Sequence, residues 1–416
     1  MAKTAIWGQT YKVLLDTGLL DSAFVLDSST LNGTDILDGT VEFADVTEYV
    51  LSASIRRGRP DQLASMPIGN ATLVLDDQAS SRSFDPSNTA SPFVQQGFGI
   101  APMRYAQIYG GTAGDEPLFI GRVRDLDISY EQPTISRAIV SLVDDLSQLG
   151  RTNLTSFTPS TELTSARINT ILDRPEVAYS TATRNIATGN ATCGTVAYDN
   201  NDNVKTAIDA VVQAEDGRFF ISRGGTATFQ PTVDFTFGTA SVFFSDTGGT
   251  AIGYQALSVG YGVETLYNRF QVGVEGIGFA VAEDSASIAE FGVQTLSLND
   301  VPLNSLTAGT TLAQNLRDKY KDPIFRFDEI SVVLNGLSPA DAEAVSTLEI
   351  GDLVSITKTF VTGSPLSVTR TMFVEQISQN ITPNSHTVTL GLGQAQLLTV
   401  FVLDSSELDD VDVGLG

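Results

Sequence analysis

Residues 43–88 constrain the fold more than any other stretch, because they read as two strands with a charged turn between them, followed by a polar turn cluster. Apolar residues alternate with small or polar ones in residues 50–55, and they do so again in residues 71–75. A period of two residues is typical of strands that bury one face. The segment therefore predicts two half-buried strands in a β-rich part of the chain.

The charged turn holds three arginines, Arg56, Arg57 and Arg59, the densest basic spot on an acidic chain. One interpretation is a solvated hairpin turn. The other is an ion-paired contact with an acidic neighbour, because a guanidinium group pairs with a carboxylate through two parallel hydrogen bonds. On the second interpretation the three arginines are candidate protein-interface residues.

Composition limits the classes of function. The chain has 416 residues, enough for two to four domains, and its 42% of hydrophobic residues can fill a sizeable core. Its 24 basic and 49 acidic residues give a formal net charge of −25, which argues against a tightly held nucleic acid. No apolar run approaches the ~18 residues of a spanning helix, and the N-terminus lacks the apolar region of a secretory signal. We therefore expect no membrane span.

Motifs for catalysis, metal binding and cofactors are weak. Cys193 is the single cysteine and His386 the single histidine. The chain therefore has too few of these residues for an internal disulfide, a zinc site built from cysteines or a histidine-based catalytic triad. Cys193 is expected to be a small buried side chain and His386 a barrel-surface residue. Glycine motifs for phosphate or dinucleotide binding are incomplete. We predict no cofactor and no enzymatic activity.

Acidic clusters have structural explanations. The pairs Asp76 with Asp77 and Asp144 with Asp145 stand at strand ends or helix starts, where aspartate is favoured, and Asp409 with Asp410 lies in the C-terminal tail. Residues 199–203 resemble part of a calcium loop but lack its central glycine and terminal glutamate, and a polar loop is the alternative. We predict no catalytic role and no metal site for them.

Clusters of glycine, proline and polar residues divide the chain into predicted domains. Residues 1–145 predict a first β domain, a small barrel or sandwich. Residues 146–240 predict an α+β insert with a hairpin and two amphipathic helices, the second of which has Asn203 as its candidate N-cap. Residues 241–400 predict a second β domain with a helix near 305–321. Residues 401–416 form an acidic C-terminal arm.

One six-residue string occurs twice, at residues 24–29 and again at residues 401–406. Either both are short extended segments alike by composition, or each docks in an equivalent groove. On the second interpretation the apolar side chains are candidate interface residues: Phe24, Val25, Leu26, Phe401, Val402 and Leu403.

The order and spacing of several phrases resemble the minor tail proteins that form the tail-tip hub of long-tailed bacteriophages and related tail-like particles. These phrases are TEYV, SIRRGR, ATLVLDD and RSFDPSN in residues 47–88, and LVDDL, SARI, SIAEFG and IGDLV further along the chain. The likeness covers most of residues 40–395. It implies a mainly β fold in which two tube-like β-barrel domains flank a small α+β domain.

The resemblance also implies a function. It implies a homotrimeric structural hub at the virion tail tip, made in the host cytoplasm, with a six-fold-like ring built from three subunits. Its partners would be a distal tail or tail tube protein, tail fibre or tip proteins and possibly a tape-measure protein, with DNA only in transit during ejection. A receptor- or glycan-binding tail protein and a cell-wall hydrolase of the tail remain as alternatives.

Overall fold

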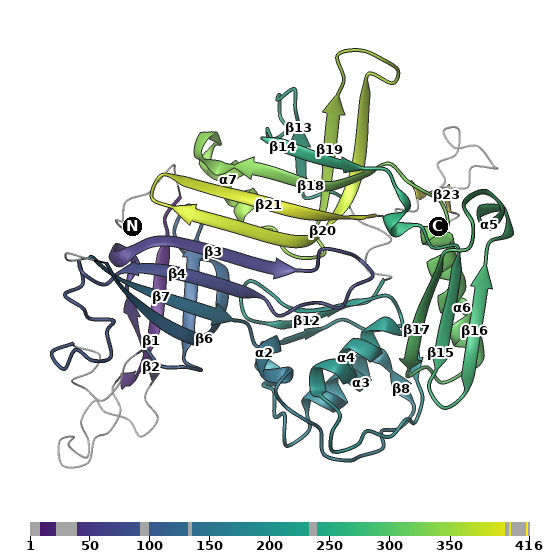
Figure 1. Cartoon of the computed structure of the whole chain (residues 1–416), viewed down its shortest axis with the longest axis horizontal. Helices are drawn as coiled ribbons and strands as arrows, with labels where there is room; N and C mark the ends of the chain where they lie inside the picture. The colour runs from purple at the N-terminus through teal and green to yellow at the C-terminus, as the bar shows by residue number, and fades with distance from the viewer. Residues whose placement is uncertain are drawn as a thin grey trace.

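One sheet of 13 strands dominates the computed structural model, which describes residues 9–21, 40–91, 100–131, 135–232, 239–395, 399–400 and 413–414 (Figure 1). Its main path runs β14-β18-β21-β20-β3-β4-β7-β6-β5-β1-β2, and β19 and β13 attach beside β20. All pairings in it are antiparallel except the parallel pair of β13 and β19. The mainly β class is therefore confirmed, while the pairings of the described strands do not close into a barrel.

The sheet has two parts with the same strand order, which we call the first and the second half-sheet. The first half-sheet comprises β1 (Lys12–Asp21), β2 (Thr40–Asp45), β3 (Val50–Gly58), β4 (Asn70–Asp76), β5 (Tyr105–Gly110), β6 (Glu116–Glu131) and β7 (Ile135–Val143). The second comprises β13 (Val242–Ser245), β14 (Ala256–Gly260), β18 (Arg326–Val333), β19 (Leu353–Thr359), β20 (Ser367–Thr382) and β21 (Ser385–Gln394). The path β3-β4-β7-β6-β5-β1 thus corresponds to β14-β18-β21-β20-β19-β13.

The long strands β6 and β20 show the correspondence most clearly. Each has 16 residues, and each forms a hairpin with the strand that follows it. Each is bulged at the equivalent position in its pairing with that strand, where Arg124 in β6 and Glu375 in β20 are the extra residues. A bulge bends its strand and redirects the side chain, so these two residues occupy matching special positions.

Alternation places one face of each half-sheet in a core. In β4, Ala71, Leu73 and Leu75 are buried while the residues between them are not. The first core is built on β1 and β3–β7, and the second on β13, β18–β21 and α7 (Pro339–Ser346). The opposite face is polar, with Ser54, Thr72 and Thr389 among its residues.

An α+β insert follows β7 and packs below the sheet in Figure 1. Its elements are α2 (Leu146–Leu149), β8 (Glu162–Leu163), α3 (Thr164–Leu172), η2 (Thr181–Thr183), β9 (Arg184–Ile186), β10 (Thr192–Cys193), α4 (Val204–Gln213), β11 (Arg218–Ile221) and β12 (Ala227–Gln230). Asn203 caps α4, since its side-chain oxygen accepts from the backbone N–H groups of Lys205 and Thr206. This confirms the predicted helix start.

A second small unit lies at the right of Figure 1. It has β15 (Arg269–Val274), β16 (Gly278–Glu283), α5 (Ser285–Phe291), β17 (Thr295–Val301) and α6 (Leu306–Tyr320). Leu312, Leu316 and Tyr320 are buried against the three-stranded sheet, on the helix face that the four-residue spacing predicts. Short elements complete the chain: η1 (Thr47–Tyr49), η4 (Val263–Thr265), η5 (Leu334–Gly336), β22 (Thr399–Val400) and β23 (Val413–Gly414).

The sequence pattern missed several elements and misplaced one residue. Strands β2, β13 and β17 and helix α5 were not predicted. His386 is not a barrel-surface residue: only 3% of it is exposed, because it shares the core-facing side of β21 with Val388 and Leu390. No helix in the described part of the chain is both long and apolar enough to cross a membrane.

Candidate functional site: the joint between the half-sheets

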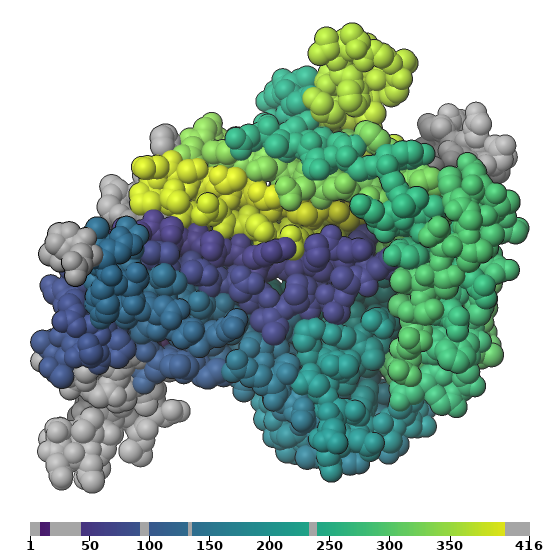
Figure 2. All heavy atoms as spheres, viewed as in Figure 1, coloured from purple at the N-terminus to yellow at the C-terminus, as the bar shows by residue number. Residues whose placement is uncertain are grey.

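The two half-sheets are joined by antiparallel pairing of β20 with β3, from Gln376 opposite Gly58 to Ile381 opposite Ala53. Figure 2 shows the two parts meeting without a gap along this line, purple against yellow. On the core side, Ile377, Ile381, Ala53 and Ile55 are buried, so the joint connects the two cores. Strands that are far apart in the sequence therefore lie in one continuous sheet.

Glu375, the bulge residue, is the centre of this joint. Its carboxylate is buried and accepts from Arg59 Nε at 2.9 Å and from Arg218 Nε at 3.1 and 3.2 Å, and Arg218 Nη2 also pairs with it. Gln62 Nε2 donates to it at 3.3 Å, and Gln62 in turn accepts from the Tyr320 hydroxyl at 3.3 Å. One carboxylate therefore links β3, the insert, the second half-sheet and α6.

The electrostatics of Glu375 follow from its two arginines. Burial alone would raise its pKa, but the charges and hydrogen bonds of Arg218 and Arg59 lower the pKa of Glu375 to about 2. The carboxylate is therefore ionised at neutral pH, and it compensates two guanidinium groups that have little contact with water. Removing it would take the compensating carboxylate away from two buried cations.

Gly58 allows the close approach of the strands. Its φ is +86°, and a Cβ there would lie 2.1 Å from the carbonyl oxygen of Glu375. The backbone N–H of Arg59 donates to that same oxygen at 2.9 Å. Only glycine fits both the left-handed backbone and the contact.

A second ion pair braces the joint from the side. Arg57 is 3% exposed and donates through Nη1 to Glu349 Oε1 at 2.5 Å. Glu349 Oε2 accepts from the backbone of Arg223 at 2.7 Å, and Arg223 Nη1 donates to Glu116 at 2.8 Å. The chain of contacts again runs from one half-sheet to the other through the insert hairpin.

Asp144 lies next to this brace, where β7 leads into α2. Its carboxylate accepts from the backbone N–H of Gly69 at 2.8 Å and of Leu146 at 3.1 Å. Burial raises the pKa of Asp144 to about 7, although these hydrogen bonds and Arg57 oppose the shift. The group therefore changes its charge near neutral pH.

His386 forms a third link between the half-sheets. Its Nδ1 lies 2.7 Å from the Tyr11 hydroxyl and its Nε2 lies 3.1 Å from Gln379 Oε1. Burial lowers the pKa of His386 to about 3, so the ring is neutral at physiological pH. It is a packed core residue.

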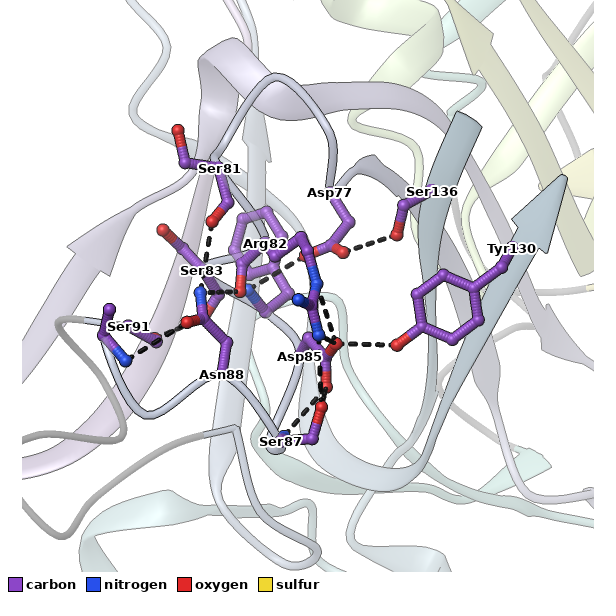
Figure 3. Close-up of polar contacts among 12 residues, drawn as sticks. Asp77, Ser81, Arg82, Ser83, Asp85, Ser87, Asn88, Ser91, Tyr130 and Ser136 are labelled. Carbon is purple, nitrogen blue, oxygen red and sulfur yellow. Dashed lines mark hydrogen bonds and ion pairs between the residues drawn. The ribbon is translucent and has the colours of Figure 1, made fainter. Parts of the chain in front are cut away.

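The polar turn cluster after β4 is a tightly bonded loop at the far end of the first half-sheet (Figure 3). Asp77 accepts from Ser136 Oγ at 2.6 Å, and Asp85 accepts from the Tyr130 hydroxyl at 2.6 Å and from Ser87 Oγ at 2.7 Å. Arg82 also pairs with Asp85. Burial would raise the pKa of Asp85, but the hydrogen bonds from Tyr130, Ser87 and Arg82 hold it well below its usual range. The loop fixes the end of β6 from which Tyr130 projects.

The predicted site residues separate into three groups. Arg57 and Arg59 are buried in ion pairs with Glu349 and Glu375 of the same chain, so the ion-paired interpretation describes them, whereas Arg56 is exposed on the polar face. A contact of these arginines with another protein stays a prediction. Phe24, Val25, Leu26, Phe401, Val402 and Leu403 lie outside the described residues.

Sequence reasoning missed Glu375, Arg218 and Glu349, because they are 126 or more residues from their partners. The available signal was a glutamate directly after three consecutive apolar residues, Met372 to Val374, in a predicted strand. Asp77 and Asp144 serve as acceptors for their own loops, as the structural explanation predicts. The described residues contain no group of three or more histidine, cysteine or acidic side chains that could hold a metal ion.

Cys193 is buried, as predicted, and burial raises the pKa of its thiol to about 11. A thiol in this state is a poor nucleophile. The geometry of the joint is that of a rigid connector, because its buried arginines pair with carboxylates from other parts of the same chain.

No protein-family model matches the sequence, and no curated protein matches it either. Solved structures do match. The tail protein from Neisseria meningitidis MC58 has a TM-score of 0.59 at 9% identity, covering 93% of this chain and 97% of that one. The 43 kDa tail protein of prophage MuSo2 from Shewanella oneidensis has a TM-score of 0.55 at 12% identity, covering 93% and 99%. At these identities the matches show a shared fold, and they confirm the resemblance at that level: this chain has the fold of phage tail proteins.

Proposed function

We propose that this chain is a structural hub protein of a phage tail tip or a related tail-like particle. The observation that carries the proposal is the end-to-end match to two tail proteins, with 97% and 99% of their chains covered. The proposed role is to join the tail tube or distal tail protein to the tip and fibres, as a homotrimer around the DNA channel. It is a mechanical role, without catalysis.

The finer architecture belongs to the same proposal. Each half-sheet would curl into a tube-like barrel domain, at residues 1–145 and 241–400, with residues 146–240 as the insert and residues 401–416 as an arm. Two matching bonds support it: the Val46 N–H donates to Val13 O at 3.0 Å, and the Ile252 N–H donates to Phe243 O at 2.8 Å. In the first half-sheet, the segment before β3 is thus hydrogen-bonded to β1. In the second half-sheet, the segment before β14 is hydrogen-bonded to β13.

The polar face of the sheet is the proposed channel wall. Serine and threonine predominate on it, and its charged residues include Arg56, Arg137, Asp125, Asp127 and Glu329. Such a wall carries little net positive charge, so it would not hold the DNA phosphates through counterion release. DNA could then slide past during ejection.

Copy number and position in the particle test this proposal. We expect quantitative mass spectrometry of purified particles to find three copies per particle, and gold-labelled antibody to mark only the tail end distal to the head. Labelling along the whole tail tube, or a copy number of one or six, would contradict it.

A further inference from the structure

The joint between β20 and β3 has an empty equivalent in the first half-sheet. On one side of β20, the N-terminal half pairs with β19 and the C-terminal half with β3. On the matching side of β6, the N-terminal half pairs with β5, but no described strand pairs with residues 125–131. The residues of this free half are exposed or only half-buried, with Tyr130 61% exposed. Among the described residues, the place that β3 fills beside β20 is therefore open beside β6.

The strand that corresponds to β3 in the second half-sheet is β14, and it too has an open edge. It pairs with β18 on one side, and no described strand pairs with residues 256–260 on the other. Val259 is 41% exposed, and Tyr261 and Val263 just after it are 70% and 66% exposed. Residues 247–263 contain no charged side chain. An uncharged, exposed edge is one that proteins cover with a partner strand.

The bulge residues supply matching charges. Beside Arg124 lies an open hollow of about 400 Å³, lined also by Arg151, Asn70 and Ser141. In the second half-sheet the bulge residue Glu375 is covered by Arg59, which follows β3 directly. Four residues after the end of β3, Gln62 also donates to Glu375, and the residue at the same spacing after β14 is acidic: Glu264, 88% exposed and 3.9 Å from Arg326 Nη2. The internal joint pairs a bulge carboxylate with an arginine, and the open edges offer a bulge arginine and a glutamate.

We propose that β14 of one copy adds as an antiparallel strand to residues 125–131 of β6 in a second copy, with Glu264 entering the hollow beside Arg124. This joint repeats the internal one with its charges reversed. The occupant is a second copy because β14 is this chain's own counterpart of the strand that fills the internal joint. The inference rests on the proposed function, since it specifies how the three copies of the hub meet.

The two edges belong to different parts of one chain, so the contact is head-to-tail. Such a contact either closes into a ring or grows into a filament. Three copies would then give a ring in which three internal joints alternate with three joints between copies. No additional protein is needed for closure.

Charge reversal tests the joint. Arg124→Glu and Glu264→Arg would be made singly and together in the full chain, and trimer formation followed by analytical ultracentrifugation over a range of concentrations. We expect each single reversal to raise the concentration at half-assembly by at least about tenfold, and the double variant to recover most of that loss. Glu283→Arg, on the exposed side of β16, is the matched control and should assemble as the unmodified chain does.

Circular dichroism and thermal melting of each variant monitor the monomer fold, which exposed positions should leave unchanged. Hydrogen exchange adds an independent readout: amides of residues 125–131 and 256–260 should gain protection on assembly. Trimers that form equally well in both single variants, or a double variant as weak as the singles, would overturn the joint. An unmodified chain that stays monomeric alone and in the particle would overturn the proposed trimer and the joint with it.

Discussion

The two half-sheets place a bulge at the same point of the same long strand, yet its surroundings differ. Glu375 in the second half-sheet is 1% exposed and held by two arginines, whereas Arg124 in the first is exposed beside an open hollow. The difference follows from what lies alongside: β3 and the residues after it cover β20, and no described strand covers the matching half of β6. Equivalent backbone positions thus carry a core group in one half and a surface group in the other.

The largest expected effect is at the bulge. Glu375→Ala leaves Arg59 and Arg218 buried without their carboxylate, and we expect it to lower the free energy of unfolding by about 3–5 kcal/mol. Arg124→Ala should change it by no more than about 0.5 kcal/mol in the monomer. Urea denaturation of the two variants compares them directly, and similar small losses at both sites would show that the bulges are equivalent in energy.

Two glycines at or just after the ends of the corresponding strands β3 and β14 extend the comparison of the half-sheets. Gly58→Ala adds a Cβ against the Glu375 carbonyl at a positive φ, and we expect a loss of about 2–4 kcal/mol. Gly262→Ala, after β14, meets no atom within 4 Å and should be neutral within about 0.5 kcal/mol. Thermal denaturation measures both. A tolerated alanine at 58 would mean that β3 and β20 can separate without cost.

Two buried titratable groups, Asp144 and His386, change the stability of the folded state with pH in opposite directions. The folded-state pKa of Asp144 is raised to about 7, so the folded state binds more protons between about pH 4 and 7 and stability falls as pH rises through that window. The folded-state pKa of His386 is lowered to about 3, so stability falls as pH drops below about 6.5.

Asp144→Asn should therefore remove a decline of a few kcal/mol in the free energy of unfolding between about pH 4 and 7, relative to the unmodified chain. His386→Gln should instead flatten the loss on the acid side. The measurement is the difference in unfolding free energy between variant and unmodified chain at each pH. Parallel curves for Asp144→Asn would show that this carboxyl does not titrate in that range.

The smallest expected effect concerns the end of the open strand. Tyr130→Phe removes the hydroxyl that donates to Asp85 at 2.6 Å, and we expect a cost of about 1 kcal/mol because the ring itself is largely exposed. Ile381, near the matching end of β20, is buried, so Ile381→Ala should cost about 2–4 kcal/mol. Equal costs would mean that the free half of β6 is as firmly packed as the covered half of β20.

The sequence predicted what local pattern controls. Alternation in residues 71–75 located β4, and Asn203 marked the start of α4. The same rule, applied to His386, would have placed it with Val388 and Leu390 in the core. Short strands such as β13 (Val242–Ser245) have too few residues for a period, and an ion pair such as Arg59 with Glu375 spans 316 positions. The repeat of the half-sheets escaped notice because it lies in strand order and bulge position, whereas the repeated string at residues 24–29 and 401–406 falls outside the described residues.

We propose that the chain carries one joint within itself and that three copies complete a ring by repeating this joint between them. A reconstruction of the assembled tip at side-chain resolution tests this most directly. We expect three copies in a ring, with β14 of each hydrogen-bonded to the free half of β6 in the next and Glu264 beside Arg124. A ring in which both edges stay unpaired, or pair with a different protein, would contradict it.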